Sequence, residues 1–223
     1  KKNVEIDLLC HGVTRSALKE QVRRRGGYHV VHWSGHGHQN LLSLTGEDGG
    51  RGSITGKELA ALFENAGGFI PQLVFLSACL SGAFVDIRDW ATLRAALLGE
   101  RPDVKDAESP ALDRIIREGT GYTGTALNLL RCGVPQVVAM RYEVGDDYAR
   151  ELARQFYRRG LADGDRLVAA DALTTARTDL RDDLEAARRL GPVNHATPIL
   201  FGHGGAFLTP RPARSKQMEA LRP

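Results

Sequence analysis

The chain has 223 residues, of which 42% are hydrophobic and 26% charged, and this suits one α/β domain with its own core. Its net charge of +3, without a basic block among aromatics, argues against direct nucleic-acid binding, and no apolar run approaches the roughly 20 residues of a membrane helix. Three widely spaced cysteines and the lack of a signal-peptide pattern favour a reducing compartment, so we expect a cytoplasmic protein without disulfides.

Strand and helix patterns alternate along the first part of the chain. They predict, in order, a strand at 4–9, a helix at 14–25, a strand at 28–34, a small hairpin at 40–54 and a helix at 55–65. Thr14 is the expected N-cap of the first helix, and Thr55-Gly56-Lys57-Glu58 has the form of a capping box. The strand at 28–34 is apolar at nearly every position, which predicts that helices cover both of its faces.

The alternation continues after a long polar insertion. An apolar strand at 73–77 precedes the insertion at 83–119, which is followed by a helix at 120–131, a strand at 135–140, helices at 146–159 and 165–190, and a strand at 197–201. This order predicts an α/β fold with a largely parallel sheet. We expect one domain over residues 1–210 and a flexible tail at 211–223.

The insertion at 83–119 differs in character from its surroundings. It is polar, contains Pro102 and Pro110, and has few strand-forming residues. Loops of this length are usually functional or disordered. We expect it to be the most mobile internal segment and a regulatory or autocleaved element, which limited proteolysis would cut first between residues 101 and 110.

Two predicted strands end in loops of small residues that carry a histidine and a cysteine. Strand formers at 30–34 lead into Gly35-His36-Gly37, and the strand at 73–77 leads into Ala78-Cys79-Leu80-Ser81-Gly82. Catalytic groups collect beyond the carboxyl ends of strands in an open parallel sheet, so we expect the two loops to meet. Cys79 would then be a nucleophile and His36 its general base and acid.

A buried core cysteine is the simpler interpretation of Cys79, because free cysteines often pack in cores. Ala78 and Gly82 favour catalysis over it, since small residues let a substrate backbone approach. The backbone amides of Gly37 and Cys79 are the expected donors to an oxyanion, although Gly37 could also be a simple turn glycine.

Other histidines are weaker candidates. His32 lies within the strand and is expected to pack in the core, whereas His38 is expected to be exposed on the loop. A metal site at His36 and His38 would lack a cysteine or carboxylate at ligand spacing, so we expect no metal or other cofactor.

Two further pairings compete with His36 for the role of base. Cys10 and His11 are neighbours on a predicted strand, and such neighbours point to opposite faces. His203 follows the last predicted strand and could reach the catalytic end, but it is interpreted as a loop residue.

Several motifs occur together along the chain: Thr14-Arg15, the His-x-x-Gly-His-Gly form of 32–37, Leu76-Ser77-Ala78-Cys79 with Ser81-Gly82, Thr125-Ala126-Leu127, Cys132-Gly133-Val134-Pro135, Asp146-Asp147, Phe156-Tyr157 and Ala176-Arg177. With these motifs the sequence resembles the CHAT domain family, a bacterial branch of the caspase-like cysteine peptidases that also include separases and metacaspases. The resemblance covers nearly the whole chain. It departs at Arg141-Tyr142-Glu143, where the family usually has an apolar residue, a Trp and a Pro.

The resemblance implies a caspase-like three-layer sandwich whose usual first strand would lie before Lys1. The insertion at 83–119 stands where caspases carry their cleavable linker. The implied activity is that of a cysteine endopeptidase with a Cys79–His36 dyad and no third residue. Two alternatives stay open: a catalytically silent module for protein interaction, and a hydrolase or transferase that uses the same dyad on a small amide.

The resemblance also bears on partners. Family members often lie behind repeat or sensor modules, and some act in bacterial immunity, which suggests antiviral defence. We therefore expect a specific protein substrate and activation by another domain or subunit, with residues 1–223 alone weakly active or inactive.

The specificity pocket is open to several interpretations. Relatives that cleave after Arg or Lys use an acidic residue there, and those that cleave after Asp use arginines. Ser77 stands where metacaspases carry an acid, and Asp146 and Asp147 fall near an expected pocket wall, although both could instead cap a helix. Arg141 could equally line the pocket, so the preferred substrate residue is left open.

Overall fold

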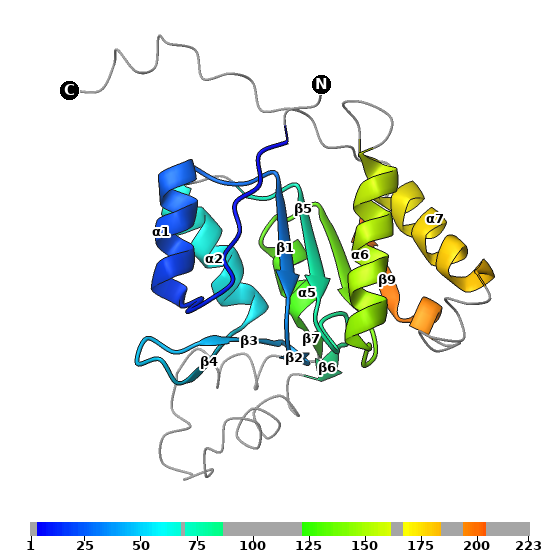
Figure 1. Ribbon diagram of the computed structural model, residues 1–223. Helices are drawn as coiled ribbons and strands as arrows, with labels where there is room; N and C mark the ends of the chain where they lie inside the picture. Colours follow the sequence, from blue (N-terminus) through cyan, green and yellow to red (C-terminus); the bar gives the residue numbers. More distant parts are fainter. Residues whose placement is uncertain (1–3, 68–69, 87–121, 162–166, 184–193, 204–223) are drawn as a thin grey trace.

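The computed structural model describes residues 4–67, 70–86, 122–161, 167–183 and 194–203, and its centre is a four-stranded sheet in the order β1-β5-β8-β9 (Figure 1). Strands β1 (Val30–Ser34), β5 (Leu73–Ser77) and β8 (Gln136–Met140) are parallel, whereas β9 (Pro198–Gly202) runs antiparallel to β8. The three parallel strands therefore present their carboxyl ends at the same edge of the sheet.

Helices cover the two faces of this sheet (Figure 1). One face carries α1 (Arg15–Arg25), α2 (Gly56–Gly67) and α5 (Thr125–Arg131), and the other carries α6 (Asp146–Gly160) and α7 (Ala169–Asp182). A short 3-10 helix, η1 (Asn194–Ala196), precedes β9. This arrangement confirms the predicted fold class, a mostly parallel sheet between two helical layers, and agrees with a caspase-like sandwich.

Strand β5 separates two hydrophobic cores. Val74 and Leu76 pack in the cluster beneath α1, α2 and α5, whereas Leu73 and Phe75 pack in the cluster beneath α6 and α7. All five residues of β5 are buried, as expected for a central strand with helices on both faces. Burying a side chain such as Phe75 stabilises the fold by roughly 1.5–3 kcal/mol. The strand that leads to Cys79 is therefore firmly held.

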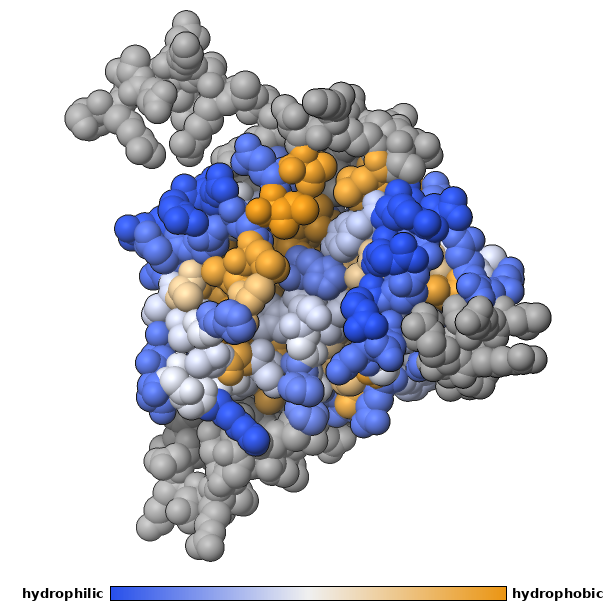
Figure 2. Space-filling model, viewed as in Figure 1, coloured by the Kyte–Doolittle hydropathy of each residue, from blue (hydrophilic) through white to orange (hydrophobic). Residues whose placement is uncertain are grey.

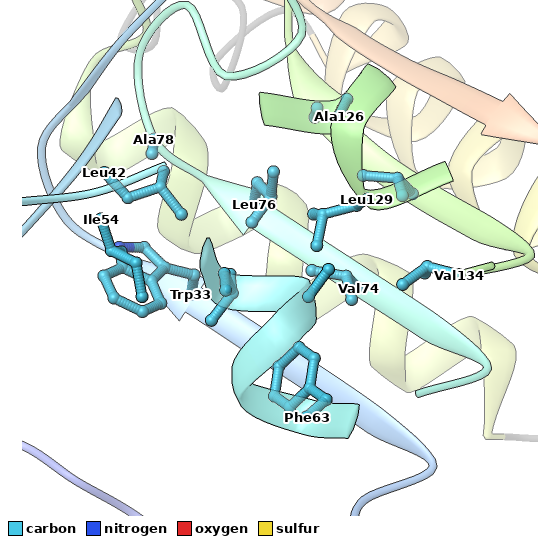
Figure 3. Packing of buried hydrophobic residues seen from close by; sticks show 14 of the residues in the cluster. Trp33, Leu42, Ile54, Phe63, Val74, Leu76, Ala78, Ala126, Leu129 and Val134 are labelled. Carbon is cyan, nitrogen blue, oxygen red and sulfur yellow. The ribbon is translucent and has the colours of Figure 1, made fainter. Parts of the chain in front are cut away.

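The predicted hairpin is confirmed as a small antiparallel sheet beyond the carboxyl end of β1. It contains β2 (Gly37–His38), β3 (Leu41–Thr45) and β4 (Arg51–Ile54). Leu42 and Ile54 belong to the same buried cluster as Trp33 of β1 and Phe63 of α2 (Figure 3). This apolar packing holds the hairpin against the ends of the central strands.

Two predicted helix starts are confirmed. The hydroxyl of Thr14 accepts a hydrogen bond of 3.1 Å from the amide of Ala17 at the start of α1. At the start of α2, the amide of Thr55 donates to the Glu58 carboxylate at 2.8 Å, and the amide of Glu58 donates to the Thr55 hydroxyl at 3.1 Å. This reciprocal pair is the capping box expected from the sequence.

The helix predicted at 120–131 begins later, at Thr125, because a short strand precedes it. Strand β7 (Tyr122–Thr123) pairs antiparallel with β6 (Val85–Asp86). The two strands bring the ends of segment 87–121 together. The mobility and cleavage expected of the insertion at 83–119 concern this segment, which lies outside the described residues. Both ends of the helix predicted at 165–190 and the whole tail at 211–223 also lie outside the described residues.

The predicted strand at 4–9 is wrong, because residues 4–10 form no regular secondary structure. The Asp7 carboxylate accepts hydrogen bonds from Arg25 at 2.5 Å and from the Tyr28 hydroxyl at 2.8 Å, and these bonds lower the pKa of Asp7. They tie the segment to the end of α1. A cleft of about 600 Å³ is lined by residues of both this segment and β1, and the two backbones do not pair.

The expectation that helices cover both faces of the strand at 28–34 also needs correction, since β1 begins at Val30 and forms the edge of the sheet. His32 and Ser34 are exposed as a result. Apolar surface gathers on this side of the molecule (Figure 2), and large exposed side chains in the neighbouring segment are Val4, Ile6, Leu8 and Leu9.

The capping box of α2 gives a test of the fold. Thr55→Ala removes both side-chain bonds of Thr55, and we expect the free energy of unfolding to fall by about 1 kcal/mol. Ser53→Ala, on the adjacent β4, is the control and should change the stability by less than about 0.5 kcal/mol. Urea denaturation measures both, and equal midpoints for the two variants would contradict the role of the box.

Candidate active site

A cleft of about 450 Å³ opens beyond the carboxyl ends of β1 and β5, on the side of the sheet that α6 covers. Both His36 and Cys79 line it, so the structure brings together the two residues that the sequence predicted to meet. The remaining wall is formed by residues from the same two strand ends and from the start of α6: His32, Ser34, Gly35, Ser77, Val144, Asp146, Ala149, Arg150 and Ala153.

The register of the two strands sets the positions of His36 and Cys79. Ser34 lies opposite Ser77 in the parallel ladder, and the amide of Gly35 donates to the Ser77 carbonyl at 3.1 Å. His36 and Cys79 each lie two residues beyond this last pair. The two loops therefore leave the sheet side by side.

Gly37 packs directly against the backbone of the cysteine loop. A Cβ atom at this position would lie 2.9 Å from the Cys79 carbonyl oxygen and 2.9 Å from the Ala78 Cβ, closer than real Cβ atoms come. On its other side, the His36 carbonyl accepts a hydrogen bond of 3.0 Å from the amide of Ser43. Because backbone groups of an antiparallel strand alternate in direction, the amide of Gly37 points away from β3.

The turn after Cys79 is anchored to β8. Leu80 adopts a left-handed conformation with φ of 57°, which costs a non-glycine residue about 1–2 kcal/mol. Ser81 offsets this cost, because its hydroxyl accepts from the Met140 amide at 3.1 Å and lies 3.4 Å from the Leu76 carbonyl. The amide of Gly82 donates to the Met140 carbonyl at 2.8 Å. The hydrogen bonds to Met140 of β8 therefore fix the conformation of the turn that carries Cys79.

The thiol of Cys79 has one polar contact among the described residues. Its Sγ lies 3.8 Å from the carbonyl oxygen of Val144, which precedes α6, and donates a weak hydrogen bond to it. Cys79 itself is half-buried, whereas His36 is exposed. The sequence analysis missed this contact of Val144, because it is made by the backbone carbonyl and the identity of the side chain gives no sign of it.

His32 also lines the cleft and is exposed, whereas the sequence predicted that it would pack in the core. Its ring stacks on Phe75 with centroids 4.9 Å apart, and its Nδ1 lies 3.0 Å from the Tyr157 hydroxyl. Although part of its surface remains open to solvent, burial lowers the pKa of His32 from 6.5 to about 4. Burial raises the pKa of Tyr157, so its hydroxyl stays protonated and shares a hydrogen bond with the imidazole.

The residues predicted for the specificity pocket divide into two groups. Ser77 and Asp146 line the cleft, whereas Asp147 and Arg141 do not. Ser77 is buried, and the other three residues are exposed. Asp147 accepts a hydrogen bond of 2.5 Å from Arg150, a cleft residue that sequence reasoning missed although it lies one helical turn further on. The N-cap of α6 is Gly145, so the two aspartates stand in the first turn and neither caps the helix through the N-cap position.

The competing candidates lie elsewhere. Strand β9 is antiparallel, and its last residue, Gly202, pairs with Gln136 at the beginning of β8. His203 therefore lies near the amino ends of the parallel strands, whereas Cys79 lies beyond their carboxyl ends. Cys10 and His11 are exposed in the irregular segment, where the expected alternation of a strand does not apply. His38 is exposed on β2 and does not line the cleft.

Comparison with known proteins identifies the class of this molecule. A mostly parallel sheet with a cysteine and a histidine beyond adjacent strand ends is the arrangement expected of a caspase-like domain. The CHAT domain model matches residues 1–203, and the chain belongs to this family. None of the curated proteins matches the sequence. Among the described residues, no helix has the length and apolar character to cross a membrane, and no three His, Cys, Asp or Glu residues are grouped to hold a metal ion.

The close approach of Gly37 to Cys79 predicts a cost for any side chain at that position. Gly37→Ala should lower the free energy of unfolding by about 1–3 kcal/mol through overpacking against Ala78 and the Cys79 carbonyl. Gly145→Ser is the matched control, because a Cβ at Gly145 meets nothing within 4 Å and serine is favoured at the N-cap position of α6. Thermal denaturation compares the two, and an unchanged midpoint for Gly37→Ala would show that the loops do not pack this closely.

The lowered pKa of His32 predicts a pH dependence of stability. Between pH 6.5 and about 4 the unfolded imidazole binds a proton that the folded one rejects, so stability is greatest above pH 6.5 and declines as the pH falls toward 4. His32→Gln should flatten this decline, whereas His203→Gln should leave it unchanged. Denaturation at pH 7.5, 5.5 and 4.5 tests it; an identical slope in His32→Gln and wild type would refute the assignment.

Proposed function

We propose that this protein is a cysteine endopeptidase that cleaves one or a few protein partners, with Cys79 as nucleophile and His36 as general base and acid. The observation that carries the proposal is that both residues line one cleft beyond the ends of two paired parallel strands. Membership of the CHAT family, which is caspase-like, supports the same reaction class. A role in bacterial antiviral defence is part of the proposal and rests on the family resemblance alone.

The reaction begins with transfer of the thiol proton from Cys79 to His36 and attack of the sulfur on the scissile carbonyl carbon. The tetrahedral intermediate collapses to an acyl-enzyme as His36 gives its proton to the departing amine nitrogen. Water, deprotonated by His36, then attacks the thioester. The carbon–sulfur bond breaks, the carboxylic acid leaves, and the proton returns to the cysteine.

The oxyanion that forms in each step needs donors, and the amides of Gly37 and Cys79 are the proposed ones. Two observations support Gly37. Its amide points away from β3, and its Cα lies tightly against the backbone of Cys79. This packing holds Gly37 against the loop that carries the nucleophile.

Activation by another domain or subunit is also proposed. In the described structure the thiol donates to the Val144 carbonyl rather than to His36, which suits an enzyme at rest. The strand β6 follows the cysteine turn after only two residues, and the amide of Ala126 in α5 donates to the Ser81 carbonyl at 3.2 Å. A partner that moved either element would shift the nucleophile without touching the chemistry.

A catalytically silent module for protein interaction is the second candidate function. Among the described residues the thiol of Cys79 has its polar contact with the Val144 carbonyl and none with His36, and this observation favours it. The intact cysteine and histidine at matching strand ends favour the enzyme. Activity measurements on point variants separate the two functions.

We expect Cys79→Ala to abolish cleavage and His36→Ala to lower kcat/KM by about a hundredfold or more. His38→Ala and His203→Ala, which remove histidines outside the cleft, should retain activity within about threefold. The assay incubates the protein, alone and with proteins encoded beside it, with a peptide library and identifies new amino termini by mass spectrometry. Loss of activity in His203→Ala but not in His36→Ala would overturn the dyad.

If no substrate is cleaved by the wild type in any mixture, while thermal denaturation shows all variants to be folded, the silent module becomes the better explanation. Cleavage that persists in Cys79→Ala would point to a contaminating protease.

A further inference from the structure

Helix α5 is hydrogen-bonded to both of the loops that carry the proposed dyad. In its first turn, the amide of Ala126 donates to the Ser81 carbonyl at 3.2 Å, in the turn that follows the cysteine. Two residues further along the helix, the side-chain amide of Asn128 donates to the side-chain oxygen of Asn40 at 2.8 Å. Asn40 lies in the turn between β2 and β3, so this second bond reaches the histidine loop.

Asn40 is a buried amide in a strained turn. It follows His36 by four residues, is 4% exposed, and has a φ of 61°, which few residues other than Gly, Asn and Asp adopt readily. Among the described residues, the other non-glycine residue with positive φ is Leu80, directly after Cys79. Backbone strain of this kind gathers at functional sites, and here it occurs once in each loop. The buried amide needs a hydrogen-bond partner, and Asn128 supplies it.

Helix α5 is itself held firmly. Its residues Thr125, Ala126 and Leu129 are fully buried, and the last two belong to the same cluster as Leu76 of β5 (Figure 3). A Cβ atom at Gly56 of α2 would lie 2.4 Å from the Thr125 carbonyl oxygen, so the two helices are in backbone contact there. A helix packed in this way gives both loops one common fixed support.

We infer that Asn40 and Asn128 are a positioning pair for the proposed reaction: their hydrogen bond fixes the loop of His36 to α5, and thereby to the turn of Cys79. The inference rests on the proposed endopeptidase function and adds two residues to it. Neither side chain lines the cleft, so the pair acts through His36 and not on the substrate. The base must lie within hydrogen-bond reach of the thiol, and a misplacement of about 1 Å can cost up to about a hundredfold in rate.

The rate at which iodoacetamide alkylates Cys79 tests the pair without a substrate, because the thiolate reacts and a base within reach helps to form it. Mass spectrometry follows the peptide that contains Cys79 at pH 7, apart from the other cysteines. Asn40→Gly keeps the left-handed backbone accessible, Asn128→Ala favours the helix, and each removes the bond. We expect each variant to lower the rate about fivefold and His36→Ala to lower it about tenfold.

Combined variants distinguish positioning from a general loss of stability. Once His36→Ala has removed the base, Asn40→Gly and Asn128→Ala should lower the rate no further, since nothing remains for the pair to position. Partial unfolding would have the opposite effect, because it would expose the half-buried thiol and raise the rate. Gln39→Ala, which removes the neighbouring amide of the same turn, is the matched control and should keep the rate within about twofold.

Four results would each overturn the inference. They are an unchanged or increased rate in Asn40→Gly and Asn128→Ala, the same loss in Gln39→Ala, a further loss when either variant is combined with His36→Ala, and an unchanged rate in His36→Ala itself.

Cleavage measurements separate this inference from the proposed function. If alkylation responds as expected but no peptide is cleaved, the inference stands and the result counts against the endopeptidase. If cleavage depends on Cys79 and His36 but is unaffected by Asn40→Gly and Asn128→Ala, the endopeptidase is supported and the inference is overturned.

Discussion

The structure depends above all on the parallel pairing of β1 with β5. The register that sets Ser34 opposite Ser77 decides where each chain leaves the sheet, and hence which side chains share the cleft. A shift of one residue would turn every side chain of one strand to the other face. Phe75 would then leave the core beneath α6, and His36 would no longer lie on the side of Cys79. The packing of the two cores and the geometry of the cleft therefore enforce the same register.

Much of the fold could be predicted from local patterns, because the hydrogen bonds and the burial behind those patterns involve residues close together in the sequence. The capping box at Thr55 satisfies two helix amides with residues only three apart, and the apolar run of β5 reflects burial on both faces. The meeting of His36 and Cys79 followed from the polarity of parallel strands. Each of these predictions needed only short stretches of sequence and a general rule of chain geometry.

The failures arise where the outcome depended on distant partners. Residues 4–9 have the composition of a strand, but pairing requires a neighbouring backbone, and the hydrogen bonds of Asp7 with Arg25 and Tyr28 hold the segment elsewhere. No motif in the sequence indicates that β9 runs antiparallel to β8, and this direction is what places His203 away from the cleft. That Asp146 and Arg150 line the cleft, whereas Asp147 does not, likewise depended on how α6 packs against the ends of β1 and β5.

The short ladder of β6 and β7 joins the two parts of the chain that flank segment 87–121. Everything before segment 87–121 supplies β1 and β5, and everything after it supplies β8 and β9, yet β5 pairs with strands from both parts. The two parts also share the core around Val74 and Val137. A single break of the polypeptide within 87–121 would thus produce two chains held in one body by a common sheet. The interface between the two parts is the interior of the domain.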